Sequence, residues 1–210
     1  MSVTSFSMKG GGQMAFDNRV LSSLQRSASH FASLLGQPRQ AGNDLIFSTK
    51  DIPFTSFKVG YDVVNKFLGK IYVLVAEARF YTKNQPPTGM AIELRYSGFF
   101  RKNKALFEVR SPKHGSVQGF RLVDKLNSNQ RLLNACLNLD LECLRLIFDK
   151  QQETWKIQAR PYGGSFVYIM LPPMRYPVNL PENHARLIVS AMKDMVHVIE
   201  RTDYPKGLQR

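Results

Sequence analysis

The sequence predicts an α+β protein, with a largely antiparallel, curved β-sheet of about eight strands packed with three helical segments. Apolar residues recur at helical spacing near both ends of the chain. Two groups of short, β-rich segments lie between them, and the period becomes helical again between the two groups. With 210 residues, 43% of them hydrophobic, the chain is large enough to bury such a core.

The first helix is predicted over residues 17–35, where apolar side chains recur at spacings of three and four. Asp17 is placed to cap its start, and Gly36 and Pro38 follow as the stop. An amphipathic stripe of this kind usually covers a sheet, although it can also serve a partner.

Strand patterns follow in a first group after this helix. The run MAIELRYS alternates apolar and polar residues, which is typical of a strand with one face toward water. The group reads as a meander, with NQPPTG as one of its turns. Its expected strands cover residues 44–49, 55–61, 69–81, 90–97 and 105–109.

A helical pattern over residues 118–139 separates the two groups, and Asn127 and Ser128 suggest a break into two short helices. The second group is predicted as three antiparallel strands, joined by the turns KQQ and PYGG, over residues 141–149, 153–160 and 164–171. Gly163 and Gly164 are expected to take positive φ in a tight hairpin. The apolar run from Phe166 to Leu171 is expected near the centre of the sheet.

The prolines after this run end the strand, so MRYPV is predicted to be a connector. Asn179 and Glu182 have the spacing of a capping box that opens a last helix over residues 180–201. Met192 belongs to the apolar stripe of that helix and is expected to face the sheet.

The chain is expected to form a single domain over residues 15–204, after a Ser/Gly-rich disordered leader at 1–14 and before a tail at 205–210. No stretch is apolar for long enough to cross a bilayer, and the first residues lack a secretory pattern. Cys136 and Cys143 lie among leucines, where buried reduced thiols are usual. These features predict a cytoplasmic protein that is not an integral membrane protein.

Recognisable catalytic chemistry is missing from the sequence. It contains no phosphate loop, dinucleotide fingerprint, nucleophile elbow or zinc-binding pattern, and its four histidines are far apart. Asp140 and Glu142, the closest carboxylates on one element, read as cap or turn residues. We therefore predict no catalytic residue, metal ligand or cofactor, and favour a non-enzymatic protein over an enzyme with an unfamiliar site.

Positive charge is concentrated in one part of the chain. Between Arg95 and Arg131, nine basic residues accompany two acidic ones, which accounts for +7 of the total formal charge of +13. Two aromatic residues precede the basic turn, as in grooves that stack bases and hold phosphates. The candidate polyanion site, called the basic segment, comprises Phe99, Phe100, Arg101, Lys102, Lys104, Arg110, Lys113 and Arg121.

The same residues would suit an anionic membrane surface, or would simply form a solvated turn. The leading expectation is a non-enzymatic binding or accessory protein that uses the sheet face or a helix groove, with a small ligand or another protein as its partner. The alternative is a nucleic-acid-binding protein that uses residues 99–121. An enzyme ranks third.

Overall fold

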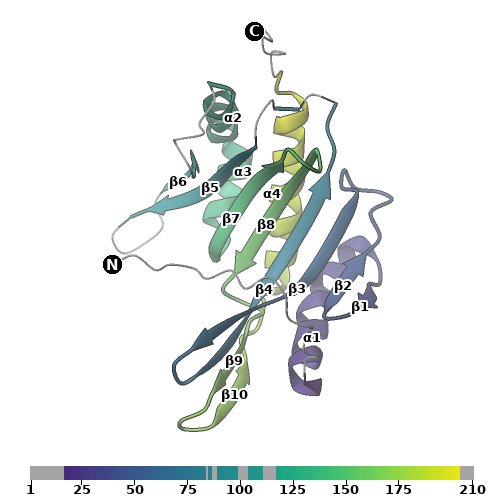
Figure 1. Ribbon diagram of the computed structural model, residues 1–210, viewed down its shortest axis with the longest axis vertical. Helices are drawn as coiled ribbons and strands as arrows, with labels where there is room; N and C mark the ends of the chain where they lie inside the picture. The colour runs from purple at the N-terminus through teal and green to yellow at the C-terminus, as the bar shows by residue number, and fades with distance from the viewer. Residues whose placement is uncertain (1–16, 84, 87–88, 99–103, 111–116, 204–210) are drawn as a thin grey trace.

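The computed structural model describes residues 17–83, 85–86, 89–98, 104–110 and 117–203, and confirms an α+β fold with a large, open, curved antiparallel sheet. The expected leader and tail lie outside the described residues. Four helices cover one face of the sheet (Figure 1), namely α1 (Asn18–Leu35), α2 (Val117–Ser128), α3 (Gln130–Leu137) and α4 (Glu182–Glu200).

The sheet has ten strands, and its main path runs β1-β2-β3-β4-β8-β7-β5-β6 with antiparallel neighbours. The second group of strands is therefore inserted between β4 and β5, which do not pair, so the simple meander expected through NQPPTG is wrong. The strands are β1 (Arg39–Ala41), β2 (Asp44–Phe47), β3 (Ser56–Lys66), β4 (Gly69–Phe80), β5 (Met90–Ser97), β6 (Lys104–Val109), β7 (Leu141–Asp149), β8 (Thr154–Pro161), β9 (Phe166–Ile169) and β10 (Met174–Pro177).

The core lies between the sheet and the helices. Trp155 stacks on Phe80, with ring centroids 6.2 Å apart, and packs against Phe148 at 5.0 Å. The apolar stripe of α4 is buried over the same face, and Met192 is fully buried as expected. Along strands such as β7 and β8, alternate residues supply this core, which leaves the intervening residues on the opposite face.

The starts of three helices test the capping predictions. The Asp17 carboxylate accepts hydrogen bonds from the backbone N–H groups of Arg19 and Val20, both at 2.9 Å. Asn129 separates α2 from α3 and caps α3, close to the expected break. The capping box at Asn179 is wrong, because Pro181 takes the N-cap position of α4 with its φ already set near −60° and no side-chain cap.

The PYGG turn does not form the expected hairpin, because β8 and β9 do not pair with each other. They lie in succession along β4, with β8 opposite residues 76–80 and β9 opposite residues 69–72. Of the two glycines, only Gly164 has positive φ. Gly163 is needed for close approach, since a Cβ there would lie 2.8 Å from the carbonyl oxygen of Asn179.

The apolar run after Gly164 is also not central throughout. Phe166 is buried, but Met170 and Leu171 are exposed at the turn into β10. The segment MRYPV, expected to be a connector, contains the strand β10. The β9–β10 hairpin lies beside the β3–β4 hairpin and projects from the body of the sheet (Figure 1). We call these four paired strand ends the ribbon.

Among the described residues, no helix combines the length and the apolar character that crossing a membrane requires.

Truncating the α4 stripe should destabilise the protein strongly. We expect Met192→Ala to lower the free energy of unfolding by about 2 to 5 kcal/mol, because the cavity left beneath α4 cannot fully collapse. Urea unfolding measures this change. Met174→Ala is a matched control at an exposed position on β10 and should change the free energy by less than about 0.5 kcal/mol. Equal effects of the two substitutions would contradict the described packing.

Candidate binding site on the open sheet face

The face of the sheet opposite the helices carries a row of polar side chains at one level. Each member lies directly opposite the next on the neighbouring strand, so the row crosses six strands. The alternation of the strands requires this placement, since the residues before and after each member point into the core. This polar row comprises Lys58, Glu77, Gln158, Arg145, Glu93 and Glu108.

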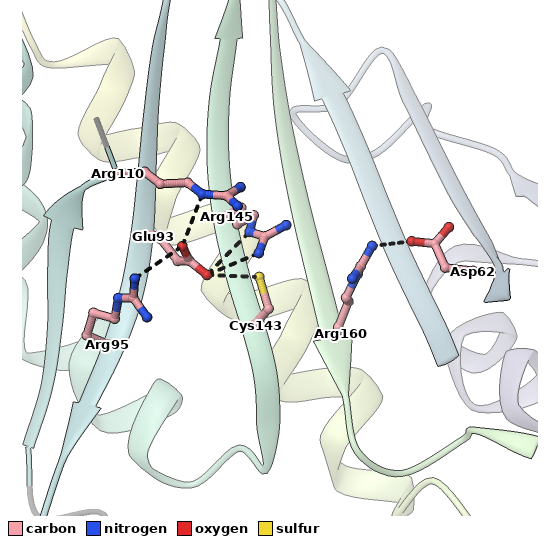
Figure 2. Close-up of polar contacts among 7 residues, drawn as sticks. All are labelled: Asp62, Glu93, Arg95, Arg110, Cys143, Arg145 and Arg160. Carbon is pink, nitrogen blue, oxygen red and sulfur yellow. Dashed lines mark hydrogen bonds and ion pairs between the residues drawn. The ribbon is translucent and has the colours of Figure 1, made fainter. Parts of the chain in front are cut away.

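Three arginines meet at Glu93 in the middle of this face. Figure 2 shows Arg95 from β5, Arg110 beyond β6 and Arg145 from β7 around its carboxylate. The shortest nitrogen to oxygen distances are 3.8, 3.7 and 3.3 Å, respectively. The backbone N–H of Arg110 donates to Ala91 at 2.8 Å, which extends the β5–β6 pairing and holds this arginine in place. We call Glu93 and its three arginines the arginine cluster.

The arginine cluster has positive charge and hydrogen-bond donors in excess. Glu108 lies opposite Glu93, so three guanidinium groups face two carboxylates. Arg145 donates two hydrogen bonds to Glu93, but the guanidinium groups of Arg95 and Arg110 donate none to any described residue. Each guanidinium has five N–H donors, and most of those on Arg95 and Arg110 have no acceptor among the described residues.

Cys143 lies against the same carboxylate, with its Sγ 3.7 Å from Glu93 Oε1. Burial, reinforced by the negative charge of Glu93 and only partly opposed by Arg145, raises the pKa of the thiol to about 11. The thiol is thus protonated at neutral pH and donates to Glu93. A protonated, buried thiol is a poor nucleophile, and this position lacks the thiolate that cysteine catalysis requires.

Arg160 on β8 forms a second ion pair on this face, with Asp62 on β3 (Figure 2). The pair reaches across β4, which lies between these two strands. The Nε atom of Arg160 is buried and has no hydrogen-bond partner among the described residues. An unpaired buried N–H carries a desolvation cost.

Glu77 is the second buried carboxylate of the polar row. It accepts hydrogen bonds from Arg79 Nε and Gln158 Nε2, both at 2.9 Å. Burial alone would raise the pKa of Glu77, but these hydrogen bonds and the charges of Lys58 and Arg79 outweigh it and lower the pKa. Glu77 therefore stays ionised and ties β4 to β8 on the open face.

Three members of the basic segment are described, and they do not gather in one place. Arg110 joins the arginine cluster, Lys104 begins β6 at the other end of the strand, and Arg121 is exposed on α2 in the helix layer. Phe99, Phe100, Arg101, Lys102 and Lys113 lie outside the described residues.

Neither Arg95 nor Arg145 was among the site residues predicted from the sequence. The alternation in MAIELRYS did put Glu93 and Arg95 on the wet face. The pairing of β5 with β7, which brings Arg145 opposite Glu93, joins segments about 50 residues apart and leaves no local signal.

No group of three or more histidine, cysteine, aspartate or glutamate side chains in the described part of the chain is arranged to hold a metal ion.

Together these features define a class of α+β protein in which four helices cover one face of an open sheet and arginines cluster on the other. Residues 29–199 match the family described as "Protein of unknown function (DUF3156)", and the chain belongs to this family. The matched region contains the whole arginine cluster and the ribbon. Comparison with curated proteins and with solved structures gave no match to either.

The lowered pKa of Glu77 makes a pH-dependent prediction. Because the folded protein favours the ionised form of Glu77, this side chain stabilises the protein at pH values above its ordinary pKa of 4.5. The stabilisation is lost as the pH falls through the lowered pKa of the folded protein. Glu77→Gln should therefore melt at a lower temperature than the parent protein at pH 7, with the difference shrinking below about pH 4. Calorimetry across this range measures it, and a difference that does not change with pH would contradict the assignment.

Proposed function

We propose that this protein is a non-enzymatic binding or accessory protein that holds an anionic ligand on the open face of its sheet. The observation that carries this proposal is the arginine cluster, in which guanidinium groups from β5, β7 and the residue after β6 meet beside Glu93. Arginine suits phosphate and carboxylate groups, because its planar fork of donors can bind two oxygens at once.

The partial burial of the cluster supports a specific binding site and not a general attraction of anions to a positively charged surface. The side chains of Glu93 and Arg145 are 11% and 24% exposed, whereas Arg95 and Arg110 are 61% and 51% exposed. Glu93 and Arg145, the less exposed pair, are joined by two hydrogen bonds and form the base of the site. The more exposed side chains of Arg95 and Arg110 lie where a ligand would contact them. Partial burial of the base of the site also lowers the local dielectric constant, which strengthens attraction for an anion.

The chemistry around the cluster supports binding without catalysis. The nearest nucleophile is the Cys143 thiol, whose pKa is raised, and its neighbour Glu93 is already engaged by arginines. Cys136 and Cys143 are both free and buried, which also accords with the cytoplasmic location that we propose.

Nucleic acid is the second candidate ligand. Lys104 begins β6 and shares the open face with Glu108 of the same strand, and Arg110, just after β6, reaches Glu93 on that face. A phosphate backbone lying along the open face would reach both. Arg121, on the helix side, would not take part in such a complex.

The test compares two double variants that remove the same charge from opposite sides of the sheet. Arg95→Met with Arg110→Met opens the cluster but leaves Arg145 to neutralise Glu93. Arg121→Met with Arg186→Met removes two exposed arginines from α2 and α4. Binding is followed by fluorescence anisotropy with labelled single- and double-stranded oligonucleotides, and by calorimetric titration with inorganic pyrophosphate, from low to physiological salt.

We expect the cluster variant to weaken binding and the helix variant to leave it unchanged. For an oligonucleotide, losing two phosphate contacts should reduce the salt dependence of log K by about 1.4 to 1.8 units. Binding of pyrophosphate alone would identify a small anionic ligand, and binding of oligonucleotides would favour the second candidate. Equal losses in both variants, or no binding of any probe at tens of micromolar in low salt, would contradict the proposal.

A further inference from the structure

The ribbon presents apolar side chains to solvent, well separated from the arginine cluster. Its four strands pair in the order β3-β4-β9-β10, with Val64 opposite Ile71, Ile71 opposite Val167, and Val167 opposite Tyr176. The two turns at its end are tied together, because the backbone N–H of Met170 donates to the carbonyl oxygen of Leu68 at 2.8 Å.

Apolar exposure at this end is far greater than a hairpin turn requires. Phe67 is 94% exposed and Leu171 is 71% exposed, and four further large apolar residues beside them are each about half exposed. Contiguous exposed apolar side chains of this size usually mark a binding surface. We call this surface the ribbon end, and it comprises Phe67, Leu68, Met170, Leu171, Met174 and Tyr176.

Two exposed lysines flank the ribbon end, and the arginine near it is paired with Asp17. Residues 63–72 and 166–177 contain Lys66, Lys70 and Arg175 and no aspartate or glutamate. Both lysines are exposed. Arg175 stacks over the ring of Tyr168 at 4.8 Å and is 3.7 Å from the Asp17 carboxylate, which ties β10 to the start of α1.

We propose that the ribbon end inserts its apolar side chains into the surface of an anionic lipid bilayer. Apolar residues at a projecting tip, flanked by lysines, match an interface where acyl chains begin just beneath negatively charged headgroups. The tip is convex and narrow, which suits shallow insertion into a fluid layer. The protein would then be a peripheral membrane protein that presents its sheet at the bilayer.

Self-association through the same surface is disfavoured by charge. Two ribbon ends in contact would bring four lysines together, Lys66 and Lys70 from each copy, whereas Arg175 is already paired with Asp17. An anionic bilayer provides the opposite sign and an apolar phase at once. A complementary groove on another protein is the remaining possibility, and the experiment below separates it from lipid.

The first measurement is sedimentation of the full chain with vesicles of phosphatidylcholine, with and without phosphatidylglycerol. We expect binding that depends on the anionic lipid and weakens with salt. Phe67→Ser should weaken it about 10- to 100-fold, because the transfer of one phenylalanine side chain is worth that factor. Phe120→Ser, at a half-exposed phenylalanine on α2, is the matched control and should bind as the parent protein does.

The second measurement reports insertion directly. Trp155 is the only tryptophan and is fully buried in the core, so lipid carrying bromine on its acyl chains should not quench its fluorescence. Phe67→Trp adds a second tryptophan at the tip. Its emission should shift to shorter wavelength on vesicles and be quenched by brominated lipid, while the parent protein changes in neither respect.

Several outcomes would overturn the proposal. These are no binding to anionic vesicles, equal binding by Phe67→Ser and the parent protein, or binding without quenching in Phe67→Trp. A concentration-dependent dimer that Phe67→Ser abolishes, in a protein that ignores vesicles, would instead make the ribbon end a contact between copies. The comparison of Phe67→Ser with the parent protein and the quenching of Phe67→Trp do not involve the arginine cluster, so these two results test the ribbon end separately from the anionic-ligand proposal.

Discussion

The shared pairing of β4 determines how the rest of the structure is arranged. One edge of this strand pairs with β3 over residues 69–79, and the other pairs first with β9 and then with β8. The part beside β8 belongs to the sheet that the helices cover, and the part beside β9 belongs to the ribbon. Gly69 lets β4 approach β9, since a Cβ there would collide with the carbonyl oxygen of Tyr168. Gly164 turns the chain from β8 to β9 with a φ of 82°, where a Cβ would collide with Leu74. The strand β4 therefore joins the helix-covered sheet to the projecting ribbon.

Covering only one face of the sheet places a second constraint on the chain. On the uncovered face no helix packs against the strands, and charged side chains on neighbouring strands contact one another instead. Buried carboxylates such as Glu77 and Glu93 need donors, because an unpaired buried charge is strongly destabilising. At Glu77, each carboxylate oxygen accepts one hydrogen bond, from Arg79 or from Gln158. Around Glu93, three arginines provide more donors than the carboxylate can accept, and this difference is our physical reason for proposing that the arginine cluster binds an anion.

Local signals in the sequence were sufficient for the fold class and for several details. The Asp17 cap, the break between α2 and α3, and the buried stripe of α4 all depend on residues within a few positions of one another. The arrangement of β8 and β9 along β4 does not, because strand order is decided by long-range pairing. The exposed Leu171 was misjudged because apolar character alone cannot separate a central strand from a projecting tip. The arginine cluster was missed because long-range pairing brings Arg145 of β7 and Arg110, after β6, to Glu93 of β5.

Arginine side-chain NMR tests the central claim, which is that the open sheet face holds an anionic ligand. Each guanidinium gives a resolved Nε–Hε resonance, which single substitutions assign to a residue, and inorganic pyrophosphate is then titrated into the full chain. The account predicts the largest, saturable shifts at Arg95, Arg110 and Arg145, with small shifts at Arg121 and Arg186 on the helices. Shifts that are uniform across all five arginines and do not saturate, or shifts that are largest on the helix side, would contradict it.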